Sequence, residues 1–121
     1  MKRHAMFLCT LVAAAACKPY GLVTADVGVM EVYGAPSASA EILHGVELRV
    51  TLRTVGPGEY ASPPDIVGES VAFLDVAYAA VQVPAGPTQV FRFVGTKPGR
   101  SIITFHNTGS SRVAVDTVIV D

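Results

Sequence analysis

The chain has 121 residues, with 9 basic and 10 acidic side chains and a formal net charge of −1 at pH 7. This nearly neutral balance, without a basic stripe, argues against nucleic-acid binding. No segment after the N-terminus is long and apolar enough to predict a membrane span. Once an N-terminal leader is set aside, roughly a hundred residues remain, which is enough for one hydrophobic core.

The N-terminus has the pattern of a secretory signal peptide. Lys2 and Arg3 form a basic tip, and a largely apolar stretch from Ala5 to Ala16 ends in small residues just before Cys17. We therefore expect residues 1–16 to be a signal peptide. The other cysteine of the chain, Cys9, lies inside this leader, so the mature chain has one cysteine and cannot form an internal disulfide.

The residues Ala14-Ala15-Ala16-Cys17 resemble a bacterial lipobox, whose cysteine is acylated and becomes the mature N-terminus. Ala14 stands where leucine is usual, and ordinary signal-peptidase cleavage after Ala16 also fits these residues. The resemblance implies a lipid on Cys17 and a membrane-anchoring tether at residues 17–25. It also implies export to a bacterial cell envelope, in the outer membrane or periplasm if the cell is Gram-negative.

Two runs of strand-forming residues flank the turn at Lys97-Pro98-Gly99. Phe91 and Phe93 share one face of the first run, and Ile103 and Phe105 share one face of the second. A two-residue hairpin would place the two pairs on opposite faces of one sheet. Either a bulge restores the parity or the runs belong to different sheets. We expect the second arrangement, a sandwich in which both pairs point inward.

The first half of the mature chain predicts two strands and a loop. Residues 26–33 alternate loosely, with Val27 and Val29 on one side, and are expected to form a weak first strand. Residues 35–40 are small and turn-rich and predict a loop. Residues 46–55 are the clearest strand, because four apolar residues alternate with charged or polar ones. The apolar face holds Val46, Leu48, Val50 and Leu52, and the solvent face holds Glu47, Arg49, Thr51 and Arg53.

In the second half, glycine and proline mark most boundaries. We expect a loop at 56–64, a strand at 66–77 with a bulge at Gly68, a reversal near Ala77, a short strand at 78–83 and a turn at 84–87.

A last hairpin follows. A five-residue loop at 107–111 leads into a strand at 112–120 and places Phe105 opposite Val113 and Ile103 opposite Val115, all inward. Together the segments predict an all-β fold: an immunoglobulin-like antiparallel β-sandwich of about seven strands over residues 26–121.

The direction of each strand places the loops at 56–64, 84–87 and 107–111 at one end of the sandwich. Loops on a rigid scaffold commonly carry function, although for each loop taken singly a simple turn of the chain is the favoured interpretation. Tyr60 is either an exposed contact residue or folded back over the mouth of the sandwich. The candidate partner-binding residues are Glu59, Tyr60, Ser62, Pro63, Gly86, Asn107 and Ser110.

The sequence favours neither an enzyme nor a metal site. His44 and His106 lie on separate elements without a cysteine partner, which is weak evidence for metal ligation. Glu59 and Asp65 flank one loop, but loop spacing fixes no catalytic geometry. We expect no cofactor, and an enzymatic or metal-binding role is the least favoured. No serine has an evident His–Asp partner set; the serines considered are Ser62, Ser70 and Ser110.

The segment Gly86 to Phe105, GPTQVFRFVGTKPGRSIITF, resembles the later half of chagasin-type inhibitors of papain-like proteases. That family has an immunoglobulin-like sandwich, a G-x-x-Q-x-F-x-F strand, a Pro-Gly turn and three loops at one end. Its first loop carries Asn-Pro-Thr-Thr-Gly and its last carries Arg-Pro-Trp. Neither sequence occurs here in residues 56–64 or 107–111, so the resemblance implies the fold and transfers no inhibitory residue.

Two functions remain open from the sequence. The favoured one is a non-enzymatic binding or structural module of the cell envelope that contacts an unknown envelope or extracellular protein through the loop end. The alternative is a chagasin-like inhibitor of papain-type cysteine proteases.

Overall fold

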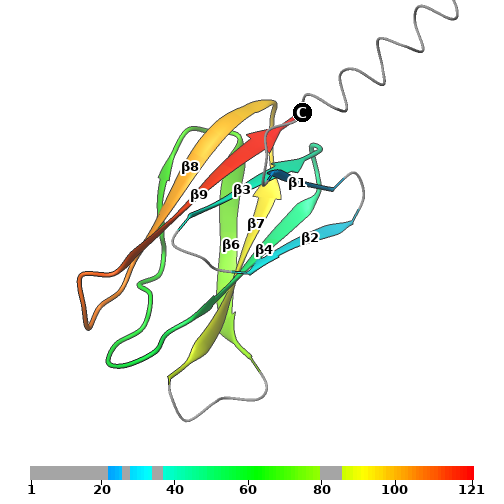
Figure 1. Ribbon diagram of the computed structural model, residues 1–121. Coiled ribbons are helices and arrows are strands. Elements are labelled where there is room, and N and C mark those ends of the chain that lie inside the picture. The colour runs from blue at the N-terminus through cyan, green and yellow to red at the C-terminus, as the bar shows by residue number, and fades with distance from the viewer. Residues whose placement is uncertain (1–21, 26–27, 34–36, 80–85) are drawn as a thin grey trace, which may run out of the picture.

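The computed structural model describes residues 22–25, 28–33, 37–79 and 86–121, and these form two β-sheets packed face to face (Figure 1). The five-stranded sheet has the order β1 (Leu22–Ala25), β3 (Ser37–Ile42), β9 (Val113–Val120), β8 (Gly99–His106) and β5 (Asp65–Val67). The four-stranded sheet has the order β2 (Val29–Tyr33), β4 (Glu47–Arg53), β7 (Thr88–Gly95) and β6 (Val71–Tyr78).

The predicted all-β, immunoglobulin-like sandwich is therefore confirmed, with nine strands in the described part of the chain rather than about seven. It is not wholly antiparallel, because β1 pairs with β3, β3 with β9 and β2 with β4 in parallel. Within the ranges described, no helix has the length and hydropathy needed to cross a membrane.

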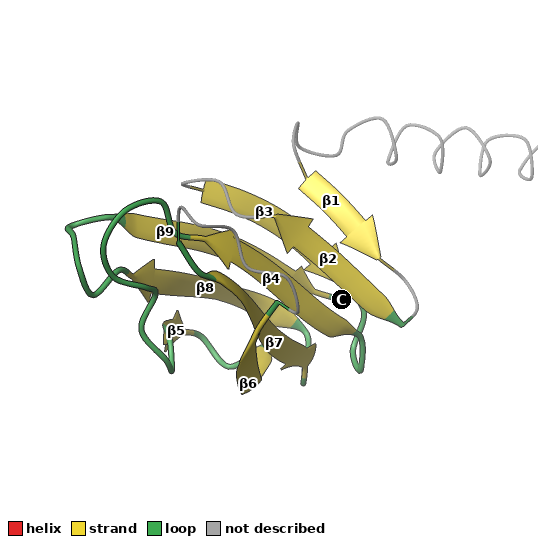
Figure 2. Cartoon of the chain, turned by 90° about the horizontal axis from the view of Figure 1, so that it is seen from below, coloured by secondary structure: helices red, strands yellow, loops and turns green. Residues whose placement is uncertain are grey.

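The core lies between β7 and β8, which face each other from different sheets (Figure 2). Phe91, Phe93, Ile103 and Phe105 are fully buried. The sandwich arrangement of the two phenylalanine-bearing runs is thus confirmed and the simple hairpin is excluded. Gly99, with a φ of 147°, lies where the chain passes from one sheet to the other.

The strand predicted at 46–55 is confirmed as β4, with its two faces as expected. Leu48, Val50 and Leu52 are buried, while the charged face points outward. In β2 the inward residues are instead Met30 and Val32, and Val29 is 42% exposed.

Two segments at the start of the domain differ from the prediction. Leu22–Ala25, assigned to the tether, forms strand β1, so the sandwich begins before residue 26. Most of residues 35–40, assigned to a loop, belongs to β3; residues 35 and 36 lie outside the described residues. The small residues of β3 have little intrinsic strand preference, but ladders to β1 on one side and β9 on the other supply the strand conformation.

The predicted strand at 66–77 is two strands in different sheets. β5 pairs with β8, and β6 pairs with β7. Gly68, where a bulge was predicted, lies at this crossing with a φ of 107°, and a Cβ there would come within 2.5 Å of the Arg100 carbonyl oxygen. The bulge in this region lies between Phe73 and Asp75. At Gly68, the close approach of the Arg100 carbonyl oxygen therefore leaves no room for any side chain.

No reversal occurs at Ala77, which pairs with Val90 inside β6. Tyr78 ends the same strand, and most of the short strand predicted at 78–83 lies outside the described residues.

The β8–β9 hairpin is shifted by one residue from the predicted register. Phe105 pairs with Ala114, and Ile103 pairs with Asp116. The connecting loop is one residue longer than predicted, because His106 pairs with Val113. Because of this shift, Val113 and Val115, which were expected to face inward, lie on the outer side of β9. Asp116 faces the core instead.

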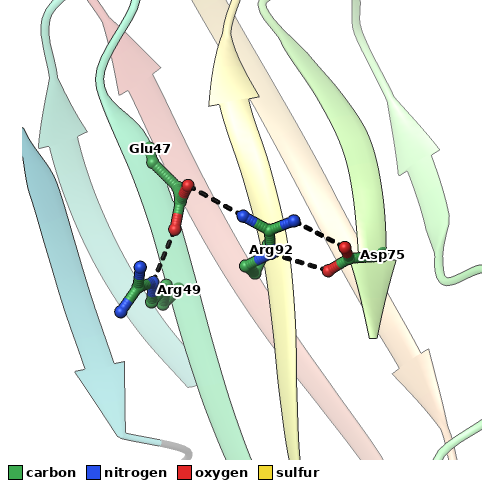
Figure 3. Close-up of polar contacts among 4 residues, drawn as sticks. All are labelled: Glu47, Arg49, Asp75 and Arg92. Carbon is green, nitrogen blue, oxygen red and sulfur yellow. Dashed lines mark hydrogen bonds and ion pairs between the residues drawn. The ribbon is translucent and has the colours of Figure 1, made fainter. Parts of the chain in front are cut away.

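The outer face of the four-stranded sheet carries a chain of ion pairs that crosses β4, β7 and β6 (Figure 3). Arg92 donates to both Asp75 oxygens, Nε to Oδ1 at 2.7 Å and Nη2 to Oδ2 at 2.5 Å. Its Nη1 also lies 3.1 Å from Glu47 Oε1, and Arg49 Nε lies 2.5 Å from Glu47 Oε2. The Arg92 hydrogen bonds lower the pKa of Asp75 and raise that of Arg92.

Candidate functional site

Three connections lie at one end of the sandwich, where β4, β6 and β8 end and β7 and β9 begin (Figure 1, lower part). We call the described residues of these connections, 54–64, 86–87 and 107–112, the loop end. The predicted clustering of three loops at one end therefore agrees with the structure, although the strand reversal used to predict it was misplaced by several residues.

The first and last loops of the loop end touch through their backbones. A Cβ on Gly58, whose φ is 86°, would lie 2.3 Å from the Gly109 backbone nitrogen. The Thr108 amide donates to the Glu59 carbonyl oxygen at 2.7 Å, and the Glu59 amide donates to Thr108 Oγ1 at 3.2 Å. Because no side chain separates them, the two loops form one continuous edge.

A buried glutamine holds the first loop in place. Gln89 of β7 is 1% exposed, and its Oε1 accepts a hydrogen bond from the Tyr60 amide at 2.9 Å. Its Nε2 donates to the Tyr60 carbonyl oxygen at 2.9 Å. The side chain therefore satisfies both backbone groups of one residue, as a neighbouring strand would.

This arrangement settles the position of Tyr60. The residue is 9% exposed and packs in the core, and its backbone forms a bridge with Asn107. The side chain is folded back over the sandwich rather than displayed for contact. Gln89 was missed as a site residue, although the signal was present: it is a polar residue in phase with the inward-facing Phe91 and Phe93.

The second connection joins the same assembly through buried Thr54. The Thr54 amide donates to the Pro87 carbonyl oxygen at 2.9 Å. A Cβ on Gly86 would lie 2.0 Å from the Thr54 carbonyl oxygen, so only glycine fits there. Asn107 Nδ2 reaches Thr54 Oγ1 at 3.5 Å.

Asn107 closes the last loop from within. It is largely buried, and its Oδ1 accepts a hydrogen bond from the Gly109 amide at 2.9 Å. Ser110 Oγ accepts from the Arg112 amide at 3.2 Å but stays exposed. Of the predicted partner-binding residues, Tyr60 and Asn107 are buried, Glu59 and Gly86 are partly buried, and Ser62, Pro63 and Ser110 are exposed.

Two polar contacts fix the sides of the loop end. The Tyr78 hydroxyl donates to Glu59 Oε2 at 2.6 Å, and this hydrogen bond raises the pKa of Tyr78. His106 Nε2 lies 3.0 Å from Asp65 Oδ2. These contacts turn Glu59 and His106 toward neighbouring strands.

No cluster of three or more potential metal ligands occurs in the described ranges. His44 is exposed on the connection between β3 and β4, at the opposite end from His106. The described residues of the loop end form a surface of small, mostly uncharged side chains. Its exposed tips are residues 56–58 and 108–111.

No protein-family model matches the chain, and no curated protein is similar to it in sequence. The fold is similar to that of EhICP2, a cysteine protease inhibitor from Entamoeba histolytica, with a TM-score of 0.58 and 16% identity over 86% of this chain and 100% of that chain. It is also similar to the solution structure of amebosin, with a TM-score of 0.54 and 17% identity over 78% of this chain and 97% of that chain. These likenesses agree with the fold implied by the resemblance of residues 86–105.

Proposed function

We propose that the chain is a protein inhibitor of papain-like cysteine proteases and binds them through the loop end. The observation that carries the proposal is the direct backbone contact between Gly58 and Gly109, which joins two loops into one edge. The shared fold with EhICP2, a cysteine protease inhibitor matched over its whole length, supports the same reading.

The shape of the loop end suits a concave active site. A protease cleft is filled best by a convex surface that is already ordered, because little conformational entropy is then lost on binding. Residues 56–58 and 108–111 carry small side chains, which allow close approach to the walls of a cleft. Exposed Ser62 and Pro63 flank these tips and supply further contact area.

The loop sequences at 56–64 and 107–111 differ from those of chagasin-type inhibitors. The proposed contact residues are therefore chosen by their exposure in this structure and not by the resemblance. They are the exposed tips at 56–58 and 108–111, and buried Gln89 and Thr54 hold the loops in place.

A titration of papain tests the proposal. The protein used is residues 18–121, which contain every described strand. We expect competitive inhibition at or below micromolar concentration and no effect on trypsin, a serine protease. Absence of papain inhibition at micromolar protein contradicts the proposal. Capture of a different envelope protein that depends on the loop end would then favour the broader reading of a non-enzymatic binding module.

We further propose that the chain is exported and anchored to the cell envelope by a lipid on Cys17. The support is the leader-like pattern of residues 1–16 and the lipobox-like residues before the cysteine. Only residues 18–21 separate Cys17 from β1, and a chain of that length spans at most about 14 Å. A lipid there would hold the domain beside the bilayer. Mass spectrometry of the mature N-terminus tests this, and an unmodified Cys17 contradicts it.

A further inference from the structure

Asp116 lies in the core of the sandwich, on the inward face of β9. It is 3% exposed and shares that face with Ala114 and Val118. In the β-ladders of the five-stranded sheet it is flanked by Ala38 of β3 and Ile103 of β8. A carboxyl group at such a position is rare unless another group pairs with it.

Within the described part of the chain, neither carboxyl oxygen of Asp116 has a hydrogen-bond partner. The space beside it is too tight to admit a water molecule. The other residues that line this space, and the β8 neighbour of Asp116, are all uncharged; they are Val32 of β2, Ala38, Ser39 and Ala40 of β3, Leu48 of β4, Val118 of β9 and Ile103 of β8.

The acidic residues of the neighbouring strands do not share this space. Glu31, Glu41 and Glu47 alternate with the inward residues of β2, β3 and β4 and belong to the outer faces. Among the residues that the structure describes, Asp116 therefore has neither a counter-charge nor a competing acid beside it.

An ionised carboxylate is very costly in a dry apolar site, and such a group normally takes up a proton instead. Burial raises the pKa of the Asp116 carboxyl to about 7. The closed sandwich therefore holds the protonated acid, and ionisation requires that water reach the side chain.

Next to Asp116, β3 contributes only two alanines, Ala38 and Ala40, and its larger core residue, Ile42, lies farther along the strand. β8 contributes fully buried Ile103 and Phe105. The free energy of burial scales with apolar area, so separating β3 from the core costs less than separating β8. On its other side β3 pairs with the four-residue edge strand β1.

We propose that Asp116 is a pH-sensitive latch: its protonated form keeps β3 packed against β9, and its ionisation releases β3 and β1 from that edge. The release is a local opening that admits water to the carboxylate while the Phe91–Phe105 core stays packed. The proposal is independent of the proposed inhibitory function.

The direction of the pH dependence follows from proton linkage. In the unfolded chain an aspartate has a pKa of about 3.9, whereas in the closed sandwich the pKa of Asp116 is about 7. The closed form thus binds more protons between these values. Its stability is fully present below about pH 4 and decreases as the pH rises toward 7, by up to about tenfold in the equilibrium constant per pH unit.

Carboxyl NMR titration and amide exchange test the latch in residues 18–121. We expect the Asp116 carboxyl to titrate well above the other aspartates, and the protection factors of β3 amides to fall at least about tenfold between pH 5 and pH 8. Amides of β7 should keep their protection. An Asp116 titration near pH 4, or β3 protection that does not change with pH, overturns the proposal.

A variant separates the latch from general pH effects. Asp116→Val removes the titrating group and suits the apolar surroundings, so β3 protection should become independent of pH and exceed that of the wild type at pH 8. The control Asp75→Asn removes an exposed, ion-paired carboxylate and should leave the pH dependence of β3 unchanged. Equal pH dependence of β3 in Asp116→Val and the wild type contradicts the proposal.

Discussion

The rings of Phe91 and Phe105 meet edge to face across the sandwich, with 5.0 Å between their centroids and 63° between their planes. They come from β7 and β8, which are consecutive in the chain but lie in different sheets. The turn between these strands is therefore a crossing from one wall to the other. The contact therefore joins the two sheets between β7 and β8, the strands that support the loop end.

Replacing Phe105 tests the importance of this contact. Phe105→Ala should destabilise the domain by about 3–5 kcal/mol, because a fully buried aromatic ring leaves a cavity that rigid strands cannot close. Chemical denaturation of residues 18–121 measures the free energy of unfolding. Arg49→Ala, on the outer face of β4, is the control and should cost less than about 1 kcal/mol, as exposed ion pairs do. Equal losses in the two variants would mean that the faces are wrongly assigned.

The strongly periodic parts of the fold could be predicted from the sequence. β4 alternates over its whole length, and the phenylalanines of β7 and β8 fix the inward faces by parity alone. β3 could not be predicted, because its alanines and serines carry no strand signal and its conformation comes from its neighbours. The β8–β9 register was predicted wrongly because the loop length was taken from composition. A shift of one residue moves every side chain of β9 to the opposite face of the sheet.

The candidate site was predicted only in position. The three loops could be placed at one end from strand directions, but which loop residues face solvent depends on contacts distant in sequence. Tyr60 is buried because Gln89, far along the chain, binds its backbone. Asn107 is buried because it closes its own loop onto Gly109. Neither contact follows from local composition.

Replacing Gln89 tests whether it holds the first loop. Gln89→Leu leaves the buried amide and carbonyl of Tyr60 without their partner, so we expect a loss of stability on the order of 2 kcal/mol or more. Exchange of the Tyr60 amide should become faster than that of β7 amides. Val90→Ala, the next residue on the opposite face of β7, is the matched control and should leave the Tyr60 amide protected. Unchanged Tyr60 exchange in Gln89→Leu would show that the loop is held by other contacts.

The ion-pair chain on the outer sheet face predicts a pKa change. Arg92 lowers the pKa of Asp75, so Arg92→Met should raise the Asp75 pKa toward its ordinary value. Because the folded pKa is the lowered one, the contribution of this pair to stability is present above the unfolded pKa and is lost as the pH falls through the folded pKa. Carboxyl NMR titration measures the Asp75 pKa in the wild type and in Arg92→Met. Added salt should weaken the effect in the wild type, and an Asp75 pKa that is the same in both proteins contradicts the ion pair.

The contact between the two loops can be broken with little other change. Gly58 and Gly45 have nearly equal φ angles, 86° and 87°, so alanine imposes similar backbone strain at each. At Gly58 the new Cβ would also meet the Gly109 nitrogen at 2.3 Å, whereas at Gly45, at the opposite end of the sandwich, nothing lies within 4 Å. Comparing Gly58→Ala with Gly45→Ala therefore separates loss of the loop contact from the destabilisation that backbone strain causes.

The inhibition constant for papain, measured for the wild type, Gly58→Ala and Gly45→Ala on folded protein at one temperature, tests the account most directly. We expect inhibition by the wild type and by Gly45→Ala within a few-fold of each other, and at least about tenfold weaker inhibition by Gly58→Ala, equivalent to about 1.4 kcal/mol. No inhibition by the wild type, or equal inhibition by all three proteins, would contradict the claim that the joined loops bind the protease.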